Sequence, residues 1–314
     1  MTLYVILILL ILLQAGIIAF LIWQSRSDTK LMKSVSETTP ESVRKFYNET
    51  TDKFLQVYGE IIQAFRTRDV ADYLQYTLQS MDVREGMTVI DAGCGVCGPA
   101  CYFAKQINDL KIHAVTVSDY QVQLAQQKIG EQGLAERVEV KQGDYQQLDK
   151  LYPEEFADRV FFLESFGHSN DKEQAILSAY RVLKPGGKLY IKDLFLRESN
   201  NEWEQQRIND IATQINLAYQ YQICDLHQVV SAIRRAGFLI DFIRPPQVER
   251  DKFEHLTISN DFQNLFNIGK IESWDDYVFP VDFFEIRATK PEFNPSRDIH
   301  LYFMNRQDAT QVVE

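Results

Sequence analysis

Basic residues and cysteines are both scarce in this chain of 314 residues. Its 33 Lys and Arg are outnumbered by 44 Asp and Glu, which gives a formal net charge of -11 at pH 7. An acidic chain without a stripe of basic and aromatic residues repels a phosphate backbone, so we expect no nucleic-acid partner. Three of the four cysteines fall between residues 94 and 101, unlike the spread spacing of a disulfide framework. The cysteine usage therefore predicts a reducing compartment.

Long apolar runs are absent except at residues 3–23, which are chiefly Leu and Ile. This run is long enough to cross the hydrocarbon core of a bilayer, so residues 1–24 are predicted to be a transmembrane anchor. A cleaved signal peptide is the alternative, but no basic segment precedes the run and no small-x-small site follows it. Arg26, Lys30 and Lys33 follow the run. The positive-inside rule then predicts a single-pass membrane protein whose catalytic domain faces the cytoplasm.

The rest of the chain has the composition of a globular domain, because 45% of the residues are hydrophobic and 25% are charged. Residues 25–43 are polar and are predicted to be a linker. We expect one domain over residues 44–290, followed by a tail at 291–314. Within residues 43–81 the apolar side chains recur at helical spacing, which predicts two or three helices before the first strand.

Short apolar segments alternate with helical patterns from residue 88 onward. Strands are expected at 88–90, 113–117, 138–142, 159–163, 188–191, 239–243 and 283–289, and helices at 100–107, 120–130, 172–182 and 226–236. This alternation predicts a mostly parallel sheet with helices on both faces, which is a doubly wound, Rossmann-like α/β domain. Residues 197–221 and 249–281 are expected insertions near the open end of the sheet.

Three glycines, Gly93, Gly95 and Gly98, follow the first expected strand and precede a helix. Glycine lets the backbone turn tightly and lets a ligand approach it closely. The same spacing occurs in dinucleotide-binding loops and in plain strand-to-helix turns, so the loop alone does not identify its ligand.

Further features accompany this loop at fixed separations. Asp91 lies two residues before the first glycine, and Asp144 follows the third strand, where a carboxylate can accept a hydrogen bond from the amine of adenine. Residues 185–187, Pro-Gly-Gly, lead from a helix into the next strand. Together these features resemble the successive motifs of class I S-adenosylmethionine-dependent methyltransferases. The resemblance implies a Rossmann-like domain that uses S-adenosyl-L-methionine as its cofactor.

Over roughly residues 45–245 the chain most resembles the sterol, tocopherol and cyclopropane-fatty-acid methyltransferases. The similarity rests on short runs at residues 46–48, 58–59, 115–121 and 163–168. That group offers Thr and Gln to the ribose in place of an acidic residue, which implies Thr116 and Gln121 here, with Val117 against the adenine. Cys97 departs from the glycine that is usual there. The expected cofactor-binding residues are Asp91, Gly93, Cys94, Gly95, Thr116, Val117, Gln121, Asp144 and Tyr145.

The candidate catalytic residues are Glu164, His168 and Tyr47. Glu164 and His168 follow the fourth expected strand, at the carboxyl edge where sheets of this kind bind ligands. Glu164 is the expected general base or cation stabiliser, and its alternative role is to cap the next helix or to bind the ammonium group of the cofactor. His168 is an expected proton acceptor or a structural hydrogen-bonding residue. Tyr47 is expected to face the cofactor or the acceptor, or else to lie in the core.

The spacing of Cys94, Cys97 and Cys101 resembles that of metal ligands, but these residues run through the glycine loop and the helix after it. We therefore expect small buried side chains and no metal.

Three functions remain open. The first is methyl transfer to a membrane-associated lipid or isoprenoid-type acceptor, with C-methylation of an alkene as one form. The second is O- or N-methylation of a polar small molecule or a phospholipid head group. The third is a catalytically silent, membrane-tethered interaction module, because one fold hosts many functions.

Overall fold

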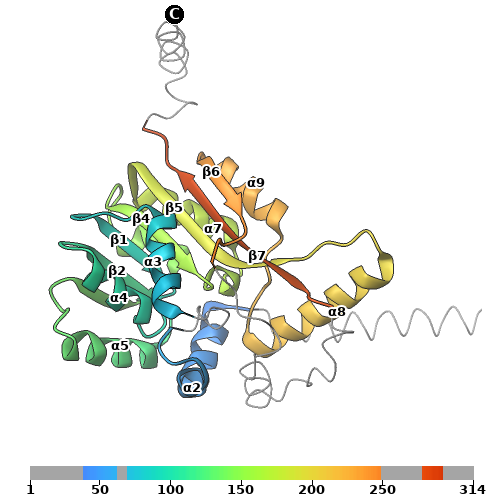
Figure 1. Cartoon of the computed structure of the whole chain (residues 1–314), viewed down its shortest axis with the longest axis horizontal. Helices are drawn as coiled ribbons and strands as arrows, with labels where there is room; N and C mark the ends of the chain where they lie inside the picture. Colours follow the sequence, from blue (N-terminus) through green and yellow to red (C-terminus); the bar gives the residue numbers. More distant parts are fainter. Residues whose placement is uncertain (1–37, 62–68, 249–277, 293–314) are drawn as a thin grey trace, which may run out of the picture. The chain divides into compact units, whose positions relative to one another are not determined.

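The structure, a computed structural model, describes residues 38–61, 69–248 and 278–292 (Figure 1). Its helices are α2 (Pro40–Tyr58), α3 (Val70–Met81), α4 (Gly98–Gln106), α5 (Asp119–Glu131), α6 (Leu148–Leu151), α7 (Lys172–Val182), α8 (Glu202–Tyr219) and α9 (Leu226–Ala236), with 3₁₀ turns η2 (Tyr145–Gln147) and η3 (Phe166–His168). Its strands are β1 (Thr88–Ala92), β2 (Lys111–Thr116), β3 (Val138–Gln142), β4 (Ala157–Leu163), β5 (Leu183–Leu196), β6 (Leu239–Arg244) and β7 (Val281–Thr289).

The strands form one seven-stranded sheet in the order β3-β2-β1-β4-β5-β7-β6. Strands β1 to β5 pair in parallel, and β7 runs antiparallel to both β5 and β6. Parallel neighbours require crossover connections, which here contain helices such as α4, α5 and α7. The arrangement confirms the predicted doubly wound, mostly parallel α/β sheet.

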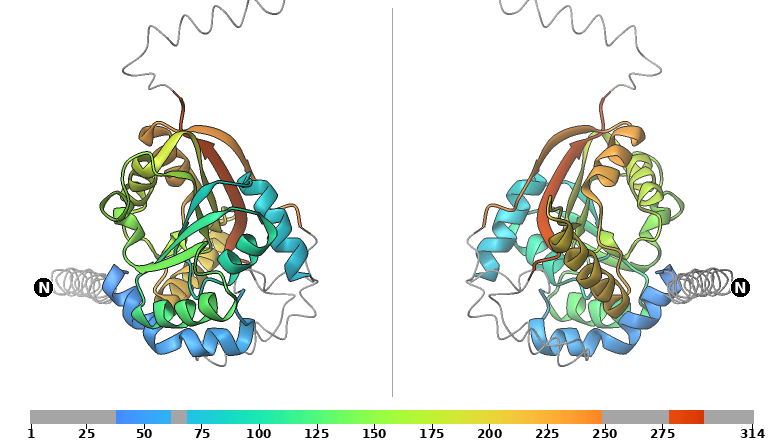
Figure 2. Two further views of the ribbon diagram at one scale, coloured as in Figure 1. Left: turned by 90° about the vertical axis from the view of Figure 1, so that its left-hand side faces the viewer. Right: turned by 90° about the vertical axis from the view of Figure 1, so that its right-hand side faces the viewer.

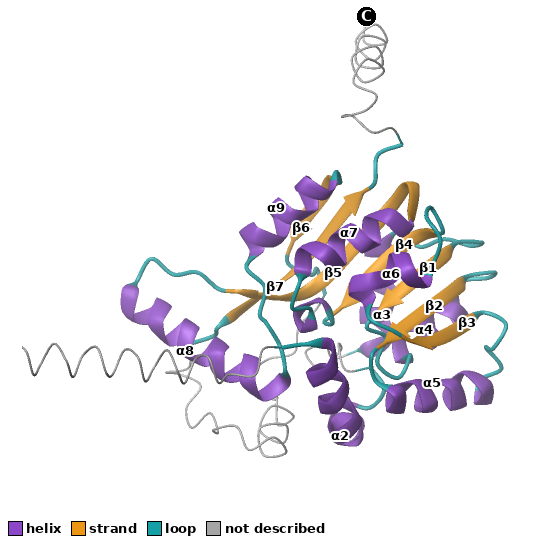
Figure 3. Cartoon of the chain, turned by 180° about the vertical axis from the view of Figure 1, so that it is seen from behind, coloured by secondary structure: helices purple, strands orange, loops and turns teal. Residues whose placement is uncertain are grey.

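Helices cover both faces of this sheet, as the two side views in Figure 2 show. Seen from behind, α6, α7 and α9 lie in front of the strands (Figure 3). One apolar core contains Ile176 of α7 and Ile233 of α9, and the other contains Leu74 of α3 and Phe103 of α4. Burial on both faces explains the nearly continuous apolar character of β4.

Helix α2 begins at Pro40, inside the segment 25–43 that the sequence assigns to a linker. Thr39 and Ser42 form a capping box, and proline at the first helical position suits the helix geometry. Apolar spacing alone predicts a start at residue 43, because the capping residues before it are polar. The two helices α2 and α3 agree with the predicted helical region before the first strand.

The first expected insertion, residues 197–221, contains helix α8, which the sequence analysis did not predict. Only Ile208 and Ala212 of this helix are buried, so its sequence shows little apolar periodicity. No helix within the described residues is long and apolar enough to span a bilayer. The predicted anchor at 1–24, residues 249–277 of the second insertion and residues 293–314 of the tail lie outside the described residues.

Candidate active site

The glycine loop turns sharply between β1 and α4. Gly93 has a φ of 89° and Gly95 a φ of 53°, both in the left-handed region that favours glycine. A Cβ atom on Gly93 would lie 2.4 Å from the Cβ of Ser165, whereas nothing lies within 4 Å of a Cβ on Gly95. Close packing therefore requires the first glycine, and the second leaves open space beside the loop.

The cysteines of this loop are buried and free. Cys97 has a left-handed backbone, with a φ of 60°, at the position where the family resemblance implies glycine. Such a conformation costs a residue with a side chain about 1 kcal/mol or more. Cys94 is also buried, and its Sγ lies 3.5 Å from the carbonyl oxygen of Gly95. The described residues hold no group of three His, Cys, Asp or Glu side chains that could bind a metal ion.

Asp91, at the end of β1, is a buried carboxylate without a partner. Its exposed fraction is 2%, and the described residues give its side chain no hydrogen bond or ion pair. Burial raises the pKa of this carboxyl to about 8. A nearby cation would stabilise its ionised form. S-adenosylmethionine carries an ammonium group, so the unpaired carboxylate and the open space at Gly95 together fit this cofactor.

The residues predicted to contact the ribose lie together where β2 leads into α5. Thr116 Oγ1 donates to Gln121 Oε1 at 2.7 Å, and Gln121 Nε2 donates to Thr51 Oγ1 of α2 at 3.2 Å. Val117 follows in the same corner and is partly buried. These hydrogen bonds tie the corner to α2, and the contact with a ribose stays a prediction.

More hydrogen bonds join α2 to the start of α5. Ser118 Oγ donates to Asn48 Oδ1 at 2.6 Å, and Asn48 Nδ2 donates to Asp119 Oδ1 at 2.7 Å. Arg44 of α2 also contacts Asp119, at 3.1 Å. Helix α2 therefore lies against α5 beside the expected cofactor site, as Figure 2 shows.

The end of β3 contributes Asp144 and Tyr145. Asp144 caps η2, with its side chain accepting from the backbone nitrogen of Gln146. Tyr145 is buried, and its hydroxyl donates to the carbonyl oxygen of Ser165 at 2.8 Å. Ser165 Oγ in turn donates to the carbonyl oxygen of Ala92 at 2.5 Å. These bonds join the ends of β1, β3 and β4 at one edge of the sheet.

Glu164 follows β4 and forms a buried ion pair with Lys192 of β5. The exposed side-chain fractions are 10% for Glu164 and 7% for Lys192. Burial disfavours the ammonium, but the Glu164 carboxylate and Tyr73 more than offset it, so the pKa of Lys192 lies above its ordinary value. Glu164 also has a φ of 53°, which is strained for a residue with a side chain and is often found at functional sites. Only Glu164 Oε1 is bonded to Lys192.

His168 and Tyr47 are in direct contact, although they are far apart in sequence. His168 Nδ1 lies 2.9 Å from the carbonyl oxygen of Gln220, which can only accept, so Nδ1 carries the proton. His168 Nε2 then accepts from the Tyr47 hydroxyl at 2.7 Å. Burial lowers the pKa of His168 to about 4, which keeps the ring neutral at physiological pH.

A second buried carboxylate supports the turn that carries His168. Asp193 Oδ2 accepts from the backbone nitrogens of Phe166 and Gly167 at 2.8 and 3.3 Å, and Asp193 Oδ1 accepts from the Tyr221 hydroxyl. Burial raises the pKa of Asp193 to about 6, and the Tyr221 hydroxyl acts against this rise. The Tyr221 ring occupies the space that a Cβ on Gly167 would need. Asp193 therefore fixes the backbone next to His168.

The structure thus brings Glu164, His168 and Tyr47 to the same edge of the sheet as the glycine loop. Lys192, Asp193 and Tyr221 were not among the residues predicted from the sequence. One signal was available, because Lys192 and Asp193 interrupt an otherwise apolar strand, and a charged pair inside a buried strand needs partners.

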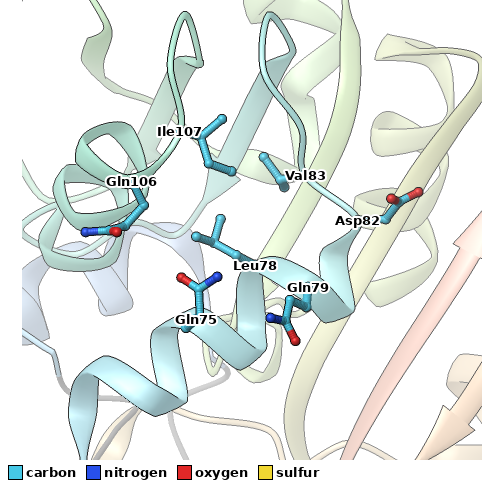
Figure 4. A pocket seen from close by; sticks show the side chains of 7 residues that line it. All are labelled: Gln75, Leu78, Gln79, Asp82, Val83, Gln106 and Ile107. Carbon is cyan, nitrogen blue, oxygen red and sulfur yellow. The ribbon is translucent and has the colours of Figure 1, made fainter.

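A hollow of about 400 Å³ lies elsewhere, between α3 and the end of α4 (Figure 4). Leu78, Val83 and Ile107 form its apolar part, and glutamine side chains stand at its rim. Gln106 and Ile107 lie at the opposite end of α4 from the glycine loop, so this hollow is separate from the candidate active site.

Residues 90–191 match a family model described as a methyltransferase domain. Among curated proteins, a sterol 24-C-methyltransferase of Aspergillus fumigatus is 27% identical over 252 residues, covering 74% of this chain and 64% of that protein. A sterol 24-C-methyltransferase of Pneumocystis carinii is 31% identical over 46% of this chain and 39% of its own length. The matches thus cover between about two fifths and two thirds of these relatives.

Solved structures share the fold at low sequence identity. A [4+2]-cyclase superposes with a TM-score of 0.64 and 21% identity, covering 81% of this chain and 96% of that one. A geranyl diphosphate C-methyltransferase from Streptomyces coelicolor, solved with S-adenosyl-L-homocysteine, superposes with a TM-score of 0.55 and 16% identity, covering 70% and 79%. The first of these neighbours carries the name of a cyclase, so the fold alone does not fix the reaction.

Proposed function

We propose that this chain, which carries a class I S-adenosylmethionine-dependent methyltransferase domain resembling the sterol methyltransferases, methylates a membrane-associated lipid or isoprenoid-type acceptor. C-methylation of an alkene is the form of the reaction that its relatives favour, because the curated relatives described above are named as sterol 24-C-methyltransferases. Methylation of a polar small molecule or head group is the alternative that the experiment below separates.

One observation carries the proposal, namely that two kinds of site meet at one edge of the sheet. Ser165 packs against Gly93 of the glycine loop, and the next residue toward the N-terminus is Glu164, which pairs with Lys192. The side chains expected to hold the cofactor and those expected to act on an acceptor are therefore connected through neighbouring residues. An acceptor next to Glu164 would lie near a cofactor held at the loop.

The cofactor, when bound, supplies an electrophilic methyl group. The protein's part is to hold the acceptor in line and to exclude water. Glu164 Oε2 accepts no hydrogen bond from the described residues and is left to stabilise positive charge or to take a proton. His168 is neutral, and the Tyr47 hydroxyl that donates to it is fixed in position. The rings of Tyr47 and Tyr221, both in contact with His168, can face a developing cation.

We also propose that residues 3–23 anchor the protein in a membrane, with the catalytic domain in the cytoplasm. The support is the apolar run in the sequence and the basic residues that follow it. Carbonate extraction of membranes and protease protection of intact cells test this. Release by carbonate, or digestion of the domain by a protease added outside intact cells, would contradict the anchor or its orientation.

The function is tested with the full chain in phosphatidylcholine nanodiscs. Calorimetric titration with S-adenosylmethionine should show saturable binding, which Asp144→Ala weakens at least tenfold and the exposed control Asp210→Ala does not. Transfer of a labelled methyl group to a total lipid extract should then label neutral lipids. Label in head-group lipids only would favour methylation of a polar acceptor. A folded protein that binds no cofactor would favour the catalytically silent interaction module.

A further inference from the structure

Tyr73 of α3 carries a buried hydroxyl that lacks a hydrogen-bond partner. The residue has an exposed fraction of 2%, and its Oη is among the buried polar atoms left unpaired within the described residues. Its ring lies against Lys192, with the Nζ atom 5.1 Å from the ring centroid. A buried hydroxyl usually finds a partner, because leaving it unpaired costs free energy. The missing partner therefore needs an explanation.

Lys192 is the neighbouring group with unused hydrogen-bonding capacity. Its ammonium has three donors; one is directed at Glu164 Oε1, and the Tyr73 hydroxyl is close enough to help raise the pKa of Lys192. Phe283 lies on another side, with its ring centroid 5.5 Å from Nζ. Glu164, at the edge of the sheet, keeps 10% of its side chain exposed.

The next polar cluster on the same face is fully paired, and the other buried tyrosine hydroxyl without a partner in the described residues, that of Tyr152, belongs to the core on the opposite face. Glu285 of β7 lies directly across from Lys192 in the sheet register. It accepts from the hydroxyls of Tyr76 and Tyr190 and from Arg244 Nε, at 2.5, 2.7 and 2.5 Å. Each of these donors has its acceptor, so Glu285 is fully engaged. The unpaired hydroxyl of Tyr73 is local to the corner beside Glu164.

We propose that Lys192 Nζ and Tyr73 Oη bind an oxygen atom of the methyl acceptor, next to Glu164. The acceptor is then an apolar molecule with a hydroxyl or carbonyl oxygen close to the atom that is methylated, and not a pure hydrocarbon. Both groups are buried, so the oxygen replaces no strong contact with water and satisfies two donors at once. This inference rests on the proposed function and names the chemical class of its substrate.

Stability separates this role from a structural one. Tyr73→Phe removes a hydroxyl whose hydrogen-bonding capacity is unsatisfied within the described residues, so its urea midpoint should equal or exceed that of the wild type. If the hydroxyl instead supports the fold, the midpoint falls, and the inference is overturned. Tyr180→Phe, on α7 and the opposite face of the sheet, is the matched control.

Binding of two probes with the same isoprenoid chain tests the recognition itself. Full-length protein in nanodiscs, saturated with S-adenosyl-L-homocysteine, is titrated with farnesol and with farnesene. We expect farnesol to bind at least about tenfold more tightly, and Tyr73→Phe to remove most of that difference while Tyr180→Phe keeps it. Lys192→Arg, which retains the charge next to Glu164, should keep part of the difference in affinity between farnesol and farnesene.

Equal affinities in the wild type, no binding of either probe, or an unchanged preference in Tyr73→Phe would each overturn the inference. The last result would mean that a water molecule satisfies Tyr73. Failure of the proposed function is seen separately, because it appears as absent titration with the cofactor product or as a labelled-methyl assay in which the wild type labels no neutral lipid.

Discussion

The two halves of the sheet edge are built in different ways. The cofactor half comprises the loop after β1 and the ends of β2 and β3, and it leaves open space at Gly95 and an unpaired carboxylate at Asp91. The acceptor half, at the ends of β4 and β5, is mostly filled by paired groups such as Glu164 with Lys192 and Tyr47 with His168, and the Tyr73 hydroxyl is the exception.

This difference indicates that the two halves control different steps of the reaction. A cofactor with its own charges can supply partners for an incomplete site, and the cost of leaving Asp91 unpaired is recovered on binding. An acceptor with few polar atoms cannot organise its surroundings in this way, so the protein has to fix these groups beforehand. Variants in the first half should therefore change cofactor affinity, and variants in the second should change turnover.

The largest effect is expected from Gly95→Val. A branched side chain in the left-handed region is strained and would occupy the space beside the loop. We expect the affinity for S-adenosylmethionine to fall by about 100-fold or more, about 3 kcal/mol, in calorimetric titration. Gly130→Ala in α5, where a Cβ meets nothing within 4 Å, is the control and should bind normally. Near-normal binding by Gly95→Val would mean that the cofactor does not approach this loop.

Tyr47→Phe tests the other half. It leaves His168 Nε2 without its donor and frees the ring to move, so turnover at saturating cofactor should fall about 30-fold, about 2 kcal/mol. Cofactor affinity should stay within about twofold. Tyr120→Phe removes a similar hydroxyl that bonds to Asp52 on the surface, and it should leave turnover unchanged. A loss of cofactor affinity without a loss of turnover would remove the distinction between the halves.

The pH dependence of cofactor binding examines Asp91 directly. Its pKa of about 8 means that the carboxyl is mostly protonated at pH 6 to 7 and must lose its proton to pair with the cofactor ammonium. Affinity should therefore rise about tenfold per pH unit up to pH 8, with close to one proton released per cofactor bound at pH 6.5. Calorimetry in two buffers of different ionisation enthalpy measures this release. In Asp91→Asn the rise should disappear, and its persistence would point to another titrating group.

The same shift has a consequence for stability. Because the folded pKa of Asp91 lies above its unfolded value of 3.8, burial of this carboxyl destabilises the free protein as the pH rises from about 4 to 8. Cofactor binding should reverse this loss. His168 acts in the opposite sense, since its pKa of about 4 removes stability as the pH falls from 6.5 to 4.

Much of the cofactor half was predictable because its signals are local. The glycines, Asp91 and Asp144 each stand next to a strand, and the alternation of strands and helices gave β3, α7 and α9 with the bounds observed. The sequence could not show that Thr116 and Gln121 bond to each other and to α2. That network depends on the docking of a helix some seventy residues away in the chain.

The acceptor half was only partly predictable for the same reason. Glu164, His168 and Tyr47 were candidates, but their partners come from β5 and from the end of α8. The strand β5 extends beyond the predicted residues 188–191. In the sequence, Lys192 and Asp193 mark the end of an apolar run, but in the structure Glu164 pairs with Lys192 and the Tyr221 hydroxyl donates to Asp193, so both can lie in a buried strand. Long-range pairing of buried charges leaves no periodic signal in one sequence.

The smallest effect is expected where the two halves are joined by α2. This helix carries Tyr47 toward the acceptor and Asn48 toward the corner of Ser118 and Asp119. Asn48→Ala removes two hydrogen bonds and should loosen that corner by about 1 kcal/mol, which lowers cofactor affinity about fivefold.

Turnover of Asn48→Ala at saturating cofactor should remain within about twofold of the wild type, because the bond between Tyr47 and His168 is untouched. Asn209→Ala on the exposed face of α8 is the control for asparagine removal. The measurement is a paired determination of the dissociation constant for S-adenosylmethionine and of the methyl-transfer rate. If both fall together, α2 moves as one body and the two halves are coupled through it. If neither changes, the contacts of α2 with α5 support the fold and do not set the affinity of the cofactor site.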